Sequence, residues 1–197
     1  MQAGVSLLEV KAPPESAPGL ARQMTWWVLA LPAALVVALT TRSFYLLDWT
    51  HVMAGVMWTG ADLFLGFILS PVMRRLGPDQ RRAVIAWLVP RTLLYMPVLA
   101  VTTGTAGWYL AAHLGLLVPG NPGRPWVFVA LAILAVLTVQ GLGILLPNSV
   151  RIYLELRRPQ PDMDRVLRWN RVNLRLSGVQ GLFQVGIILV MARFVVG

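Results

Sequence analysis

The chain has 197 residues, of which 57% are hydrophobic and only 13% are charged. A soluble domain carries about 25% charged residues, so this composition excludes an ordinary soluble protein and indicates an integral membrane protein. The absence of cysteine excludes disulfides, iron–sulfur clusters and thiolate metal sites. The net charge of +9 does not predict a nucleic-acid partner, because the arginines lie between the apolar segments, where they set membrane topology.

The apolar segments predict an all-α integral membrane protein, a bundle of about five transmembrane helices. Residues 1–23 contain three prolines and no sustained apolar period, so we expect a flexible cytoplasmic tail. Residues 24–197 are expected to form a single transmembrane helical bundle. Each predicted span reaches or exceeds the ~18 residues that mark a membrane helix; the spans are 24–41, 47–73, 90–113, 125–147 and 174–196.

The basic residues predict the orientation of the bundle. Fourteen Lys and Arg residues lie in the tail and in the connections after the second and fourth spans, and only three lie on the other side. Cytoplasmic loops carry the excess of basic residues, so we expect a cytoplasmic N-terminus and an external C-terminus in a bacterial inner membrane. Between the last two spans, the fourth helix is expected to continue to Arg158 and to break at Pro159 and Pro161, before a new helix starts.

Four residues of the second span form the predicted functional stripe. His51, Gly55, Trp58 and Asp62 are spaced so that they share one face of a helix. Polar groups inside a membrane usually face the interior of a bundle, where they mark a site, and we expect Asp62 to handle protons. The alternative is a structural hydrogen-bond cluster between helices, in which Asp62 pairs with polar residues of other spans: Thr102, Thr103, Thr105, Gln140 and Gln184.

The chain has two histidines, His51 and His113. His51 lies as far before Met73, at the end of the second span, as His113 lies after Arg91, at the start of the third. Both are therefore expected near the outer face at nearly equal depth. Imidazole is a common metal ligand, and two imidazoles that face each other across a bundle provide the axial ligands of a b-type haem. The alternative is that each histidine hydrogen-bonds lipid headgroups or a helix end.

Small and aromatic residues near the histidines suit a flat cofactor. Three glycines are expected to leave space for the ring, and three aromatic residues to stack on it or enclose it: Gly55, Gly104 and Gly107, and Trp58, Trp108 and Tyr109. Copper is the competing metal, because thioethers bind its reduced ion. Methionine also fills gaps in apolar packing, and packing is the interpretation favoured for the four methionines in this region: Met53, Met57, Met73 and Met96.

The segment at residues 51–60, HVMAGVMWTG, resembles a signature of small haem-associated membrane bundles. These include the HemJ-type protoporphyrinogen oxidases, the copper-resistance D type proteins and the membrane urate oxidases, in which a histidine is followed seven residues later by Trp and then by Gly. The resemblance continues through residues 91–95 and 170–193, and it implies that His51 is a haem ligand. The HemJ type also uses a membrane lysine, whereas the only lysine of this chain is Lys11 in the tail.

Together these patterns predict a membrane b-type haem protein that acts in electron transfer or haem-linked oxidation, with His51 and His113 as axial ligands. Its expected partners are the lipid bilayer and a redox partner or larger membrane complex. Three other functions remain open: a porphyrinogen oxidase with Asp62 as its base, a copper transporter, and a structural subunit of a larger complex. The sequence does not indicate a hydrolase, because it places no nucleophile–base pair and no phosphate-binding glycine loop for chemistry.

Overall fold

The structure, a computed structural model, describes residues 19–196. The greater part of the expected tail, residues 1–18, lies outside the described residues. All regular structure between residues 19 and 196 is helical, and four helical segments are long and apolar enough to cross a membrane. Together with one shorter apolar helix, they confirm the predicted all-α membrane bundle of about five helices.

The chain begins with α1 (Leu20–Gln23), η1 (Trp26–Leu29) and α2 (Ala30–Thr40), and the last two form the shorter apolar helix. Two long segments each contain a π-helical part. These are α3 (Phe44–Leu63), η2 (Phe64–Leu69) and α4 (Ser70–Arg75), and later α6 (Arg124–Gln140), η3 (Gly141–Leu145) and α7 (Leu146–Leu156). The other two are the unbroken helices α5 (Pro78–His113) and α8 (Met163–Val196).

The long helices run past the ends of the expected spans. Helix α5 begins at Pro78 rather than at residue 90, because proline suits the first position of a helix. In addition, the Gly77 N–H donates to the Gln80 side chain across 3.0 Å. The interruption predicted at Pro159 and Pro161 is confirmed, since the segment between α7 and α8 is not helical.

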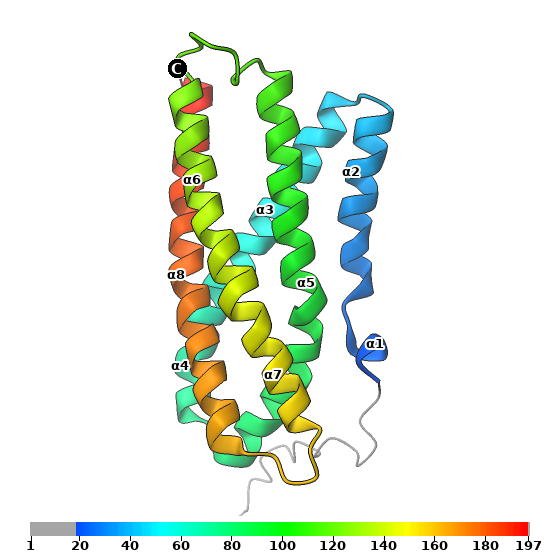
Figure 1. Ribbon diagram of the computed structural model, residues 1–197, viewed down its shortest axis with the longest axis vertical. Helices are drawn as coiled ribbons and strands as arrows, with labels where there is room; N and C mark the ends of the chain where they lie inside the picture. The colour runs from blue at the N-terminus through cyan, green and yellow to red at the C-terminus, as the bar shows by residue number, and fades with distance from the viewer. Residues whose placement is uncertain (1–18, 197) are drawn as a thin grey trace, which may run out of the picture.

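The helices pack side by side along one long axis (Figure 1). Helix α2 packs on the outside against α3 and α5, and α3 also packs against α8. The α6–α7 segment crosses this group, so α6 lies beside α8 and α7 lies beside α5. The core near the predicted stripe is formed by buried residues of several helices: Val28, Leu31, Ala54, Trp58, Leu99 and Leu137.

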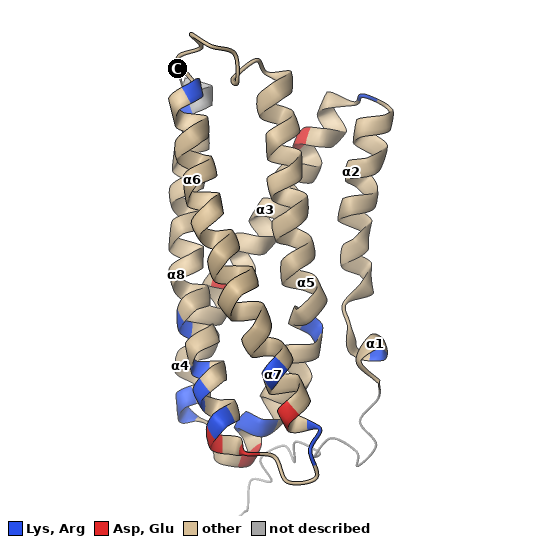
Figure 2. Cartoon of the chain, viewed as in Figure 1, with Lys and Arg blue, Asp and Glu red and all other residues tan. Residues whose placement is uncertain are grey.

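Basic residues gather at one end of the bundle, which we call the arginine-rich end (Figure 2). It contains the turn between α4 and α5 and the connection between α7 and α8. At the end of α7, the buried Glu155 side chain accepts hydrogen bonds from two residues of this connection, the Asp162 backbone N–H (3.1 Å) and Arg158 (3.3 Å). These bonds fold the connection back over the end of the bundle, where it links α7 to α8.

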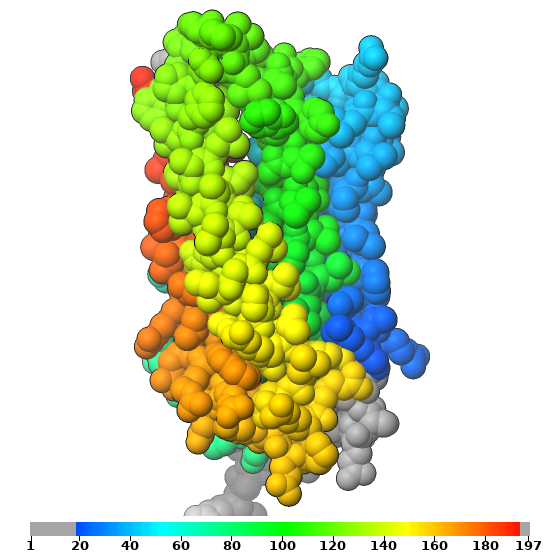
Figure 3. Space-filling model, in the orientation of Figure 1, coloured from blue at the N-terminus to red at the C-terminus, as the bar shows by residue number. Residues whose placement is uncertain are grey.

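A cavity of about 340 Å³ lies between α5, η3, α7 and α8, with part of α6 along one side. Helices α5 and α6 make few contacts, and the seam between them lies on the face seen in Figure 3. On α5 the lining extends from Leu88 to Thr105, which corresponds to about 25 Å of helix rise. The cavity is therefore long and narrow, and it runs along the bundle axis.

Candidate functional site

The predicted stripe of α3 faces the interior of the bundle. Trp58 and Asp62 are buried, with 4% and 0% of their surface exposed, and His51 and Gly55 are half-buried. The neighbouring Val56, in contrast, is exposed toward the membrane. The helical spacing thus identified the buried face of α3.

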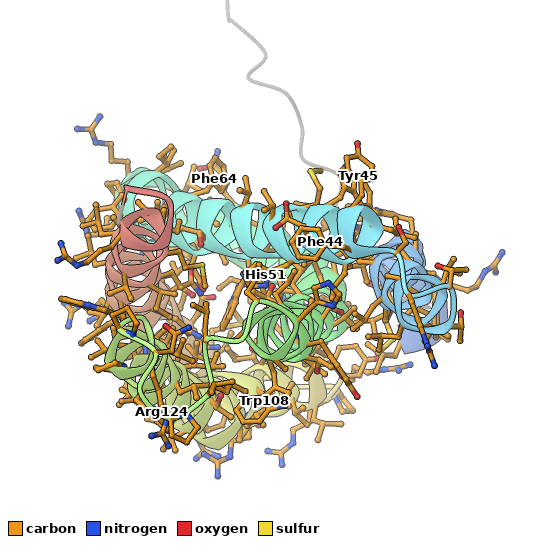
Figure 4. The ribbon with its side chains drawn as sticks, turned by 90° about the horizontal axis from the view of Figure 1, so that it is seen from above. Phe44, Tyr45, His51, Phe64, Trp108 and Arg124 are labelled. Atoms are coloured by element: carbon orange, nitrogen blue, oxygen red, sulfur yellow. The ribbon has the colours of Figure 1, made fainter. Side chains whose placement is uncertain are left out.

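His51 lies in the seam between α3 and α5 (Figure 4). Its Nδ1 is 3.0 Å from the Thr103 carbonyl oxygen on α5. Because a carbonyl only accepts, Nδ1 carries the proton and donates, which leaves Nε2 with a free lone pair. The ring also packs against Gly107, where an added Cβ would be 2.7 Å from His51 Cε1. Gly107 is therefore the position that admits the imidazole.

The structure does not bring His113 to His51. His113 is exposed, and its ring stacks on Phe44 with centroids 5.1 Å apart. Phe44 lies two helical turns before His51, or about 10 Å along the helix axis. The short connection at 76–77 sets which residues of α3 and α5 lie at the same depth. His51 is nearly as far before the end of α4 as Thr103 is after the start of α5, so these two residues lie at the same level. The prediction of equal depth placed the start of α5 too late.

The glycines expected to leave room for a flat ring instead allow side chains of the protein to pack closely. An added Cβ would lie 3.4 Å from Thr103 at Gly55 and 3.3 Å from Leu134 at Gly104, and Gly107 is filled by His51. The aromatic residues do not gather around one space either: Trp58 is buried, whereas Trp108 and Tyr109 are exposed by 49% and 46%. The described residues therefore do not fit a haem held between His51 and His113.

Asp62 is the buried carboxyl group of the membrane interior, near the middle of its helical segment. Its Oδ2 accepts a hydrogen bond of 3.0 Å from Gln184 Nε2 on α8. Ser177, also on α8 and 5% exposed, is a second polar neighbour. Gln140 does not join this group, because it donates to the Leu176 carbonyl across 2.8 Å. Thr103, which was also expected near Asp62, lies instead beside His51, where its backbone carbonyl accepts the imidazole hydrogen bond.

Two oxygens of the Asp62–Gln184 pair lack a donor. Asp62 Oδ1 and Gln184 Oε1 are buried without a hydrogen-bond partner among the residues described here. Both are acceptors when the carboxyl is ionised, and a buried acceptor without a donor costs roughly 1–3 kcal/mol. One proton on the carboxyl group supplies a donor and removes the excess of acceptors. The chemistry of the pair thus suits a protonated Asp62.

Helix α8 contributes four polar residues that the sequence reasoning did not assign to the site: Asn170, Asn173, Ser177 and Gln180. Together with Gln184, which was expected near Asp62, they follow one another at spacings of three and four, so they share one face. All except the half-buried Asn173 are buried, and all except Gln184 line the cavity. The spacing was readable in the sequence, since apolar helices rarely repeat amide side chains on one face by chance.

The methionines occupy separate parts of the core. Met57 and Met96 pack in the cluster around Trp58, whereas Met73 belongs to another cluster near the arginine-rich end. Met53 is 37% exposed. Over the described stretch, no three His, Cys, Asp or Glu side chains gather to hold a metal ion. The positions of Met57, Met96 and Met73 agree with the packing interpretation, whereas Met53 lies on the surface.

Comparisons of the chain with protein-family models, with curated proteins and with solved structures give no match. The proposed function therefore rests on the chemistry of the site itself.

Proposed function

We propose that this chain is a membrane protein that carries a proton on Asp62 inside its helix bundle and exchanges it with one side of the membrane. The unpaired oxygens of Asp62 and Gln184 support this proposal, because a proton on the carboxyl group adds a donor where two buried acceptors have none. Asp62 forms no ion pair within residues 19–193. An ionised carboxylate without a partner charge is costly in a membrane interior, so the neutral form is the resting form.

The exchange takes place toward the arginine-rich end. Ser177 neighbours the Asp62 carboxyl group and also lines the cavity, which continues toward Asn170 near that end. Polar side chains along this path offer hydrogen-bond partners to a moving proton. From the positive-inside rule we infer that the arginine-rich end is cytoplasmic and the C-terminus external, and we propose a bacterial inner membrane as the location.

Infrared difference spectroscopy tests this proposal directly. The protein is reconstituted in liposomes and its spectra are recorded at neutral and alkaline pH. We expect the carbonyl band of a protonated carboxylic acid in the wild type, its loss in Asp62→Asn, and its retention in Asp48→Asn, which changes an exposed aspartate of the same helix. A pH-sensitive dye in the bulk solution of the detergent-solubilised protein then reports proton release after a jump to alkaline pH, and Asp62→Asn should release one proton fewer per chain than Asp48→Asn. A wild type without the Asp62 band refutes the proposal.

A second candidate is a b-type haem held by His51 alone. The observation in its favour is the hydrogen bond from Nδ1 to the Thr103 carbonyl, because a ligating histidine characteristically donates its other nitrogen to such an acceptor. A haem held by His51 through Nε2 would supply redox chemistry for haem-linked oxidation or electron transfer. His51 would hold the iron, and Gly107 would set the position of its ring.

Absorption spectra of the protein purified from haem-replete cells test this candidate. A Soret band that His51→Ala removes and His113→Ala leaves unchanged supports a single-histidine haem. A colourless wild type refutes the haem without affecting the proton proposal. A reduced spectrum that changes in His113→Ala would restore the two-histidine arrangement and contradict the register seen between α3 and α5.

A further inference from the structure

We propose that the cavity between α5, η3, α7 and α8 binds a membrane quinone, a function that goes beyond the proton exchange at Asp62. The quinone would lie along the bundle axis with its ring near Ser177 and Gln180. Three properties of the cavity carry this inference: the charge of its lining, its shape and position, and the kind of polar group that it presents.

The lining indicates an uncharged occupant. None of the residues that line the cavity is Lys, Arg, His, Asp or Glu. A charged headgroup placed there would lose its hydration without gaining a partner charge, which is strongly unfavourable. Phospholipids and fatty acids with ionised headgroups are therefore disfavoured, whereas a neutral amphiphile enters at little electrostatic cost.

The shape and position indicate an occupant with an apolar chain. The cavity extends along α5 from Leu88 to Thr105, and its wall toward the seam between α5 and α6 contains the exposed Val101 and Leu142. Both residues face the region that lipid covers in a membrane helix. A ligand therefore enters from the bilayer, and an isoprenoid or alkyl tail fits the apolar part of the cavity. The volume, about 340 Å³, lies within the range of small-molecule sites.

The polar groups indicate a quinone head. Gln180 is 2% exposed, lines the cavity, and has a buried Oε1 without a partner in the part of the chain that is described. Ser177 lies one turn away on the same face. The next buried amide toward the arginine-rich end is that of Asn170. An amide or a hydroxyl both donates and accepts, so these residues can pair with the carbonyl oxygen of a quinone or the hydroxyl of a quinol. Neither the quinone nor the quinol requires a charged side chain as its partner.

The π-helical segment η3 (Gly141–Leu145) lines the cavity beside Gln180. Single-turn π-helices interrupt the regular hydrogen bonding of a helix and occur frequently at functional sites. At Gly141 an added Cβ would lie 3.7 Å from Gln180 Nε2, so this glycine is in contact range of the Gln180 amide. Gly141 thus leaves the space beside the Gln180 amide free of a side chain.

The binding experiment uses the purified full chain in detergent, titrated with decylubiquinone and measured by native mass spectrometry. We expect saturable binding of one molecule per chain. Val101→Trp places a large side chain at the opening and should weaken binding by at least about tenfold. Val139→Trp is the matched control, because Val139 is also strongly exposed (72%, against 63% for Val101) but does not line the cavity. Both variants should keep the wild-type circular dichroism spectrum, since both positions are exposed.

Gln180→Leu tests the polar contact and should also weaken decylubiquinone binding by about tenfold, with folding checked by thermal unfolding. Two competitors are used: monolaurin, which has a neutral glycerol head, and laurate, which has a charged carboxylate head. The proposal is overturned if decylubiquinone does not bind saturably, if Val101→Trp binds it as well as Val139→Trp, or if either competitor displaces it at equal concentration. Each of these measurements is independent of the infrared band of Asp62, so the two proposals can fail separately.

Discussion

The contact between η2 and α8 gives the sharpest test of this structure. At Gly66, the two helical segments meet backbone to backbone: an added Cβ would overlap the Cα of Gly178 and lie 2.5 Å from its amide nitrogen. Neither atom belongs to a flexible side chain, so Gly66→Ala must push the two helices apart. Gly60→Ala, on the same membrane span, is the matched control, because an added Cβ there meets no atom within 4 Å.

The magnitude follows from the difference between the two variants. Replacing helical glycine by alanine gains roughly 0.8–1 kcal/mol at either position through helix propensity, and this term cancels in the comparison. Overpacking a close contact costs about 1–3 kcal/mol. We therefore expect Gly66→Ala to be less stable than Gly60→Ala by about 1–3 kcal/mol. Because Gly66 is one turn from Asp62, the separation should also weaken the hydrogen bond between Asp62 and Gln184.

Reversible unfolding in mixed micelles, followed by circular dichroism while the fraction of denaturing detergent is raised, measures this difference. Equal stability of Gly66→Ala and Gly60→Ala would refute the close approach of η2 and α8. It would also remove the geometric basis of the Asp62–Gln184 pair, since that pair joins the same membrane span to α8.

Three further predictions use the same unfolding assay. Asp62→Asn should change stability by less than about 0.5 kcal/mol, because an asparagine amide imitates a protonated carboxyl, whereas Asp62→Leu should cost about 1–3 kcal/mol by leaving the amide partner unpaired. Gly107→Ala should cost about 1–3 kcal/mol in the wild type and nearly nothing in His51→Ala, where the imidazole that it would meet is absent. Trp58→Ala should cost about 3–5 kcal/mol because the side chain is buried, and Trp49→Ala, at a position 42% exposed, less than about 1 kcal/mol.

Each of these predictions has a contradicting result. Strong destabilisation by Asp62→Asn would mean that Asp62 is needed as an ion and not as an acid. Additive effects of the changes at His51 and Gly107 would show that the ring does not occupy the space at that glycine. Similar losses in the two tryptophan variants would contradict the burial of Trp58 in the bundle.

The sequence by itself determined the membrane bundle and the face of α3 that carries the site. Apolar length is enough to identify a membrane helix, and helical spacing is enough to place His51 and Asp62 on one side of it. Ser177 and Gln180 also share one face of α8 by their spacing, but only the structure showed that this face is buried. These properties are local, because they depend only on the order of residues within one helix.

Only the tertiary structure decided which residues of different helices meet. The short connection at 76–77 sets the register of α3 against α5, and it places Thr103, not His113, beside His51. The pairing of Asp62 with Gln184 was one of several possibilities in the sequence, and the packing of α3 against α8 selected it. The cavity depends on the divergence of α5 from α6, a relation between helices that no pattern within a single helix contains.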